Sequence, residues 1–127
     1  MPDYVEKEVA AALKASPDVQ AACGGRVFPV KIPQGTLLPV AVFQRAYTGP
    51  EHTLCGYNSE RVTVIVKSFA ETYEEVKALA MAVRSAMAAA PLSALLRDEL
   101  DLFENNGGVY CVHAEYDCRQ HEGGFYG

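Results

Sequence analysis

The sequence is poor in basic side chains and contains no tryptophan. Its 127 residues include 11 lysines and arginines against 16 aspartates and glutamates, which gives a formal net charge of −5 at pH 7. Proteins that bind nucleic acid through its phosphates take their affinity from lysine and arginine. The acidic balance therefore argues against a dedicated nucleic-acid binder.

Long apolar runs are also missing. The charged segment 1–8 lacks the apolar stretch of a signal peptide. The most apolar stretch, 79–96, is interrupted by Arg84 and Pro91, so we expect no segment that spans a membrane. These absences predict a protein made in a cytosol-like compartment, where its four cysteines stay reduced.

What is present is typical of one globular domain. Half of the residues are hydrophobic and 21% are charged. A chain of this length buries about two thirds of its unfolded surface, so its core needs no disulfide or metal. We expect a single domain over 1–127, with a flexible C-terminal tail from about Arg119.

Three segments have helical patterns. Apolar residues recur at helical spacing in 3–15, and a short second helix is expected over 17–23. The third runs over 73–90 and begins with a capping box, Thr72 with Glu75 three residues later. We expect this helix to be the main core element, and its apolar face consists of Val76, Leu79, Ala80, Val83 and Met87.

Alternating apolar and polar residues predict strands over 39–47, 60–69 and 109–118. We expect 26–38 to form an extended edge or loop, because its prolines withhold the N–H groups that a central strand needs. The stretch 92–100 is assigned to one or two short helical turns. This order predicts an α+β fold, an antiparallel sheet of three to four strands with helices packed on one face.

Metal-ligand spacing is irregular. Cys111, His113, Cys118 and His121 lie close together in the sequence. In a regular strand, however, Cys118 falls on the face opposite to Cys111 and His113. The spacing also differs from that of structural zinc sites, so we expect no metal.

Signals for catalysis are equally weak. Cys23 lies at the end of a helix, where the dipole disfavours a thiolate, and Cys55 lies near His52 without a third orienting group. The carboxylates of 98–104 are typical of a solvated face. We therefore expect no enzyme and no cofactor, but an α+β module that acts through its surface.

An ordered set of features gives the sequence a family resemblance. A leading helix meets Gly25-Arg26-Val27-Phe28-Pro29, and a proline-glycine stretch precedes the strand 39–47. The strand Arg61–Val66 follows, Phe69 leads into the third helix, and an aromatic strand ends near Asp117. In this order the chain resembles the tail completion proteins of long-tailed bacteriophages, also called tail terminators, and the related head–tail joining proteins.

The resemblance implies a virion protein. Such proteins are similar to tail-tube subunits in fold and assemble, usually as hexamers, into a ring on a finished tube in the host cytoplasm. This chain would then cap the head-proximal end of the tail, stop tube polymerisation and form the surface that joins the head. Its partners would be further copies of itself, the tail tube protein and head connector proteins. DNA would pass through an acidic lumen without specific binding, because like charges repel.

Residues 48–59 form either a long connection or the tip of a long hairpin, and they are the candidate contact loop. The segment lacks a regular pattern and is long for a compact domain. It holds His52, Leu54 and Tyr57, and aromatic side chains such as Tyr57 anchor interfaces. The alternative is a loop whose apolar residues fold back onto the core.

Two other classes of function stay open. One is a small ferredoxin-like ligand-binding or regulatory domain, which needs a concave apolar pocket. The other is a thiol or zinc enzyme built on Cys111, His113 and Cys118.

Overall fold

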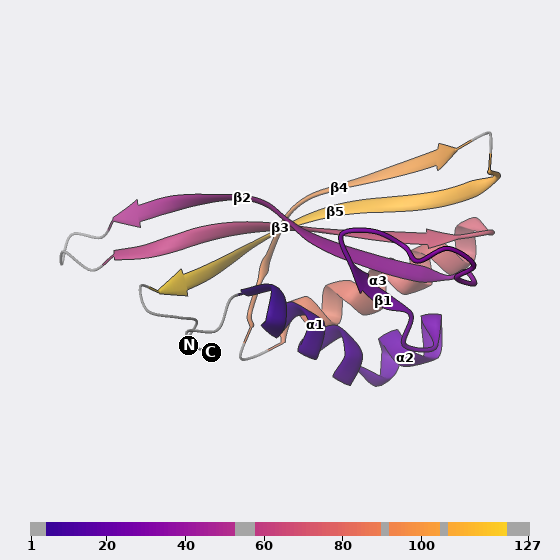
Figure 1. The fold of residues 1–127 in the computed structure, drawn as a ribbon, viewed down its shortest axis with the longest axis horizontal. Coiled ribbons are helices and arrows are strands. Elements are labelled where there is room, and N and C mark those ends of the chain that lie inside the picture. The colour runs from indigo at the N-terminus through magenta and orange to yellow at the C-terminus, as the bar shows by residue number, and fades with distance from the viewer. Residues whose placement is uncertain (1–4, 53–57, 90–91, 105–106, 122–127) are drawn as a thin grey trace.

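The computed structural model describes residues 5–52, 58–89, 92–104 and 107–121. Within these residues, three helices lie on one face of a five-stranded sheet (Figure 1). The elements, in chain order, are α1 (Val5–Ala15), α2 (Pro17–Cys23), β1 (Val27–Pro29), β2 (Val40–His52), β3 (Asn58–Ala70), α3 (Tyr73–Ala88), β4 (Leu95–Glu104) and β5 (Val109–His121). The fold is α+β, with helices on one face as predicted.

The sheet differs in detail from the prediction of three to four antiparallel strands. Its described strands follow the order β1-β2-β3-β5-β4. β2, β3, β5 and β4 pair antiparallel, but β1 pairs with β2 in parallel, with 27–29 beside 41–43. The connection 30–39 returns the chain to the start of β2, so the two strands run in the same direction. The sheet is therefore mixed.

β1 lies at the edge of the sheet, as the prediction of an extended edge over 26–38 requires, whereas β4 is a strand that the sequence did not predict. The prediction of helical turns over 92–100 is wrong, because Leu95–Glu104 pairs along β5. A register shift between Leu96 and Asp98 places Leu95 and Leu100 on the same face despite their odd spacing. A shift of one residue exchanges the two faces of a strand, and this hides the two-residue period in the sequence.

The helix ends follow the predicted signals. The Ser16 side chain accepts a hydrogen bond from the Val19 N–H, and Gly24 ends α2 at a φ of 61°, which suits glycine. At α3 the Thr72 hydroxyl accepts from the Glu75 N–H at 3.2 Å and donates to the Glu75 carboxylate at 2.9 Å. No described helix is long and apolar enough to cross a membrane.

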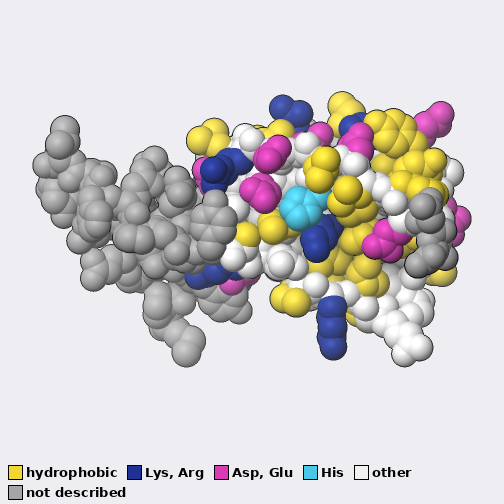
Figure 2. All heavy atoms as spheres, turned by 90° about the horizontal axis from the view of Figure 1, so that it is seen from above, with side chains coloured by type: hydrophobic (Ala, Val, Ile, Leu, Met, Phe, Trp, Pro, Cys, Tyr) yellow, Lys and Arg dark blue, Asp and Glu magenta, His cyan; other side chains and the backbone are white. Residues whose placement is uncertain are grey.

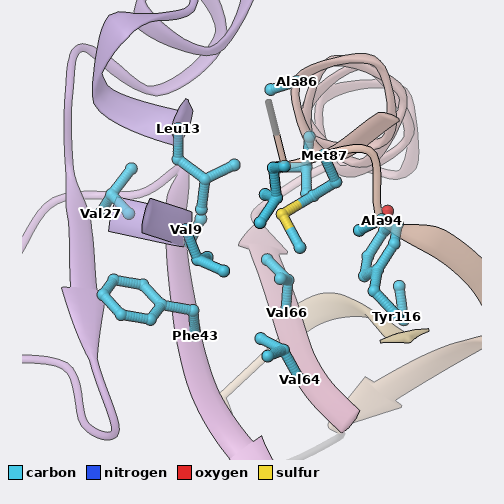
Figure 3. Close-up of a cluster of buried hydrophobic side chains, with 14 of the residues drawn as sticks. Val9, Leu13, Val27, Phe43, Val64, Val66, Ala86, Met87, Ala94 and Tyr116 are labelled. Carbon is cyan, nitrogen blue, oxygen red and sulfur yellow. The ribbon is translucent and has the colours of Figure 1, made fainter. Parts of the chain in front are cut away.

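The main core lies between the helices and the sheet. Figure 3 shows Val9 and Met87 from two helices facing Phe43, Val64 and Val66 on the strands. Leu79 and Val83 belong to the same cluster, which confirms α3 as a core element. The other two predicted α3 residues, Val76 and Ala80, lie in a smaller cluster with Ala70 and Val112.

The segment 48–59 is the end of a long hairpin. β2 continues to His52 and β3 begins at Asn58, with these two residues paired. Gly49 and Pro50 are tolerated in β2 because the described part of β1 pairs only with 41–43, so β2 is an edge strand beyond that point. Of the two expected forms, the end of a long hairpin is therefore the observed one, and its strands extend further than predicted, through 48–52 and 58–59.

Candidate interaction surface

Two hairpins point in opposite directions along the sheet, β2–β3 to the left and β4–β5 to the right in Figure 1. The predicted contact residues belong to the first hairpin. His52 is the last residue of β2, whereas Leu54 and Tyr57 lie outside the described residues. Their part in an interface stays a prediction.

The sheet face without helices carries a row of apolar side chains. Val40, Phe69, Cys111 and Leu102 lie opposite one another across β2, β3, β5 and β4. Val40 and Cys111 are buried, Phe69 is half-buried and Leu102 is exposed. Figure 2 shows this face, with hydrophobic side chains gathered toward one end of it. The face is apolar at the end where β4 lies and mixed elsewhere.

β4 exposes more apolar surface than the other described strands. Leu95 is 71% exposed and Leu100 is 55% exposed, and Leu102 and Phe103 are also exposed. Exposed apolar patches on a soluble protein mark interaction sites. An alternation in the sequence, Leu100 and Leu102 around Asp101, was the available signal for this site.

Aromatic and charged contacts hold β4 beside α3. The ring centroids of Phe103 and Tyr110 are 4.7 Å apart, and those of Tyr110 and Tyr73 are 5.8 Å apart. The Tyr73 hydroxyl donates to the Asp101 carboxylate at 2.8 Å, and the Lys77 ammonium lies 3.3 Å from that carboxylate. The strand therefore holds its position while its leucines remain exposed.

The Cys111 and Cys118 thiols are unsuited to nucleophilic chemistry. Burial raises the pKa of Cys111 to about 11 and that of Cys118 to about 12, so both carry a proton at neutral pH. Cys111 and His113 share one face of β5 and Cys118 lies on the other, as predicted. Among the described residues, no group of three or more histidine, cysteine or acidic side chains is placed to hold a metal ion.

The helix side carries a groove of about 500 Å³ between α1, α2 and α3. Small side chains line it, among them Ala11, Ala15, Ser85 and Ala89, and the carboxylates of Glu8 and Asp18 lie at its wall. This groove is the concave surface that a ligand-binding domain would need.

These features are typical of a small structural domain that works through protein contacts. Residues 7–121 match the family described as tail completion protein gp17, and the chain belongs to that family. Membership confirms the resemblance found in the sequence and implies a non-enzymatic role.

A chain in the virion of a native gene transfer agent (GTA) particle has a similar fold. Its TM-score is 0.66 at 14% sequence identity, and the match covers 87% of the present chain and 90% of that chain. The comparison with curated proteins gives no match.

Proposed function

We propose that this protein completes the phage tail by capping the tail tube as a ring, which stops tube polymerisation and presents the surface for head joining. Membership of the tail completion family carries this proposal. The similar chain belongs to a virion particle, which supports a place in the virion. Within the virion, the proposed position is the head-proximal end of the tail. Assembly would take place in the host cytoplasm.

The exposed apolar side chains of β4 support a function in binding other proteins. Leucines exposed along β4 do not stabilise a monomer in water, whereas each one buried in an interface contributes up to about 1.5–3 kcal/mol. A ring, which we expect to be a hexamer, would bury such surface between copies and against the tube and head connector proteins. The net charge of −5 suits a lumen that lets DNA pass without binding.

The groove on the helix side favours a second candidate, a small ligand-binding domain of ferredoxin-like type. Its walls consist largely of alanine, which offers a ligand few specific contacts. A tail protein can use the same groove to receive a side chain of another virion protein.

A tube-growth assay tests the proposed function. Tail-tube subunits from the same particle are polymerised, and tube lengths are measured by electron microscopy before and after this protein is added in excess over tube ends. We expect elongation to stop, whereas an unrelated protein of equal charge leaves growth unchanged. Continued elongation with the protein bound in excess would contradict the proposal.

A further inference from the structure

We propose that the subunits of this ring associate head to tail, with β4 of one copy docked against the open edge of β2 in the next copy. The inference rests on the proposed function and names the two surfaces that form the ring. β4 and the β1–β2 pair lie at opposite ends of the described sheet.

The first of the two surfaces is the outer edge of β4, which docks on the next copy. One side of this strand pairs with β5, and the other side has no partner strand among the described residues. An edge strand with unpaired N–H and C=O groups is a template for a further chain. Charged side chains along it, including Glu99 and Glu104, deter indiscriminate pairing, whereas Leu100 and Leu102 favour a specific partner.

The second surface is the β1–β2 edge, which receives β4 of the neighbouring copy. In the part of the chain that the structure describes, its outer backbone groups are already bonded along β1, but the later part of β2 lacks a partner strand on that side. The outer edge of β1 is closed, because the Val27 N–H donates to the Gly25 carbonyl and Pro29 has no N–H. The Pro29 carbonyl in turn accepts from the Lys31 N–H at 2.7 Å. The Phe43 carbonyl accepts a hydrogen bond from the Val30 N–H. Beyond Phe43, the outer edge of β2 has no partner strand among the described residues.

A hollow of about 380 Å³ lies where β1 ends beside β2. It is lined by Glu6, Pro29, Val30, Phe43, Gln44 and Arg45. Val30 is 68% exposed and has a φ of 63°, an unfavourable conformation for a β-branched residue. The hollow has an apolar wall beside an open strand edge, and it can receive an apolar side chain of the next copy.

Charge distinguishes the two surfaces and fits them to each other. Residues 24–46 contain three basic side chains, Arg26, Lys31 and Arg45, and no acidic one. Arg45 forms an ion pair with Glu6 of α1 at 2.7 Å, so the charge argument rests on Arg26 and on the exposed Lys31. Residues 95–104 of β4 contain four acidic side chains and one basic one. Opposite charges across an interface select the partner and its register.

The position of the two surfaces determines the kind of assembly. Contact between two different patches is heterologous, and repeated heterologous contacts give a ring when the rotation closes. A symmetric dimer through β4 alone would bring two acidic strands together. A second copy offering its β2 edge is therefore the favoured occupant.

Charge reversal tests the inference. We compare Lys31→Glu, the pair Glu99→Lys with Glu104→Lys, and the variant that carries all three changes. Lys14→Glu on α1 is the control for Lys31→Glu, and Glu71→Lys with Glu74→Lys is the control for the glutamate pair, since each makes the same charge change at exposed positions elsewhere. Thermal unfolding verifies that each variant is folded.

The measured quantity is the protein concentration at which half of the tube ends carry a ring. We expect each reversal to raise this half-saturating concentration at least fivefold at 0.1 M salt. The combined variant should return it most of the way to the wild-type value, and the controls should match wild type. At 1 M salt the differences should shrink, because the screening length falls from about 10 Å to about 3 Å.

Covalent trapping provides a second measurement. A chain with Val30→Cys and Leu100→Cys, in a Cys55→Ser background, should form a ladder of disulfide-linked oligomers on tube ends. Each single variant should give no ladder. Rings in wild type with no effect of reversal and no ladder would overturn the inference alone, whereas absence of rings in wild type would overturn the proposed function as well.

Discussion

Valine supplies much of the buried surface at the scale of single residues. Three valines of β3 face the helices and are fully buried: Val62, Val64 and Val66. They lie in one cluster with Leu79 and Met87 of α3. β-branched side chains suit strands, since their restricted χ1 costs little there and their bulk fills the space above the sheet. The core therefore depends on a few side chains that α3 places against this row.

Leu79 tests that dependence. It is fully buried, so Leu79→Ala should lower the free energy of unfolding by about 2–5 kcal/mol through lost burial and the remaining cavity. Met81 on the same helix is 68% exposed, and Met81→Ala should change stability by less than about 0.5 kcal/mol. Denaturant titration measures both, and a loss below about 1 kcal/mol for Leu79→Ala would mean that this core assignment is wrong.

Tyr116 carries a buried hydroxyl that has no hydrogen-bond partner among the described residues. Burial also raises the pKa of this phenol, so the hydroxyl stays protonated. Removing an unpaired buried polar group is neutral or stabilising, and Tyr116→Phe should leave the unfolding free energy unchanged or raise it by up to about 1 kcal/mol. A decrease of more than about 1 kcal/mol, measured by the same titration, would show that the hydroxyl forms a bond in solution.

Helices and strands could be predicted from the sequence wherever neighbouring residues, such as a helix cap or an alternating pattern, determine them. The capped helices follow from Ser16, Gly24 and Thr72, and β3 follows from its alternating valines. β4 could not be predicted in this way, because its register shift breaks the alternation and its leucines are exposed. Tertiary pairing with β5 decides that stretch, and a single sequence does not show pairing.

The same limit applies to β1 and the hairpin end. Three residues of β1 form a strand only because β2 lies alongside, and 48–52 extend β2 because β3 continues beside them. The exposed leucines of β4 were therefore missed, while His52, Leu54 and Tyr57 were selected by residue type alone.

A variant of the β2–β3 hairpin end tests that selection. With Leu54→Ser and Tyr57→Ser together, we expect near-normal stability but loss of joined, infectious particles, because aromatic and aliphatic anchors contribute most of the energy of an interface. Particle yield and thermal unfolding are measured in parallel. Normal yield would remove this segment from the interface, and a large loss of stability would place it in the core.

At the scale of the whole molecule, one sheet connects two different ends. The segment 24–46 at the β1–β2 end has basic but no acidic residues and borders a hollow, whereas the β4 end is acidic and apolar. A chain with two unlike surfaces at opposite ends of a rigid sheet is suited to head-to-tail assembly. The tail completion family to which it belongs makes the end of a tail tube the expected place for that assembly.

The most direct measurement is the structure of a tail-tube end saturated with this protein. Electron cryomicroscopy of tubes incubated with excess protein should show one additional ring at the head-proximal end, into which copies of this fold can be placed with their sheets side by side. The account predicts such a ring on tubes with the protein and its absence on tubes without it. Tube ends that bind the protein in excess but show no additional ring density would contradict the central claim.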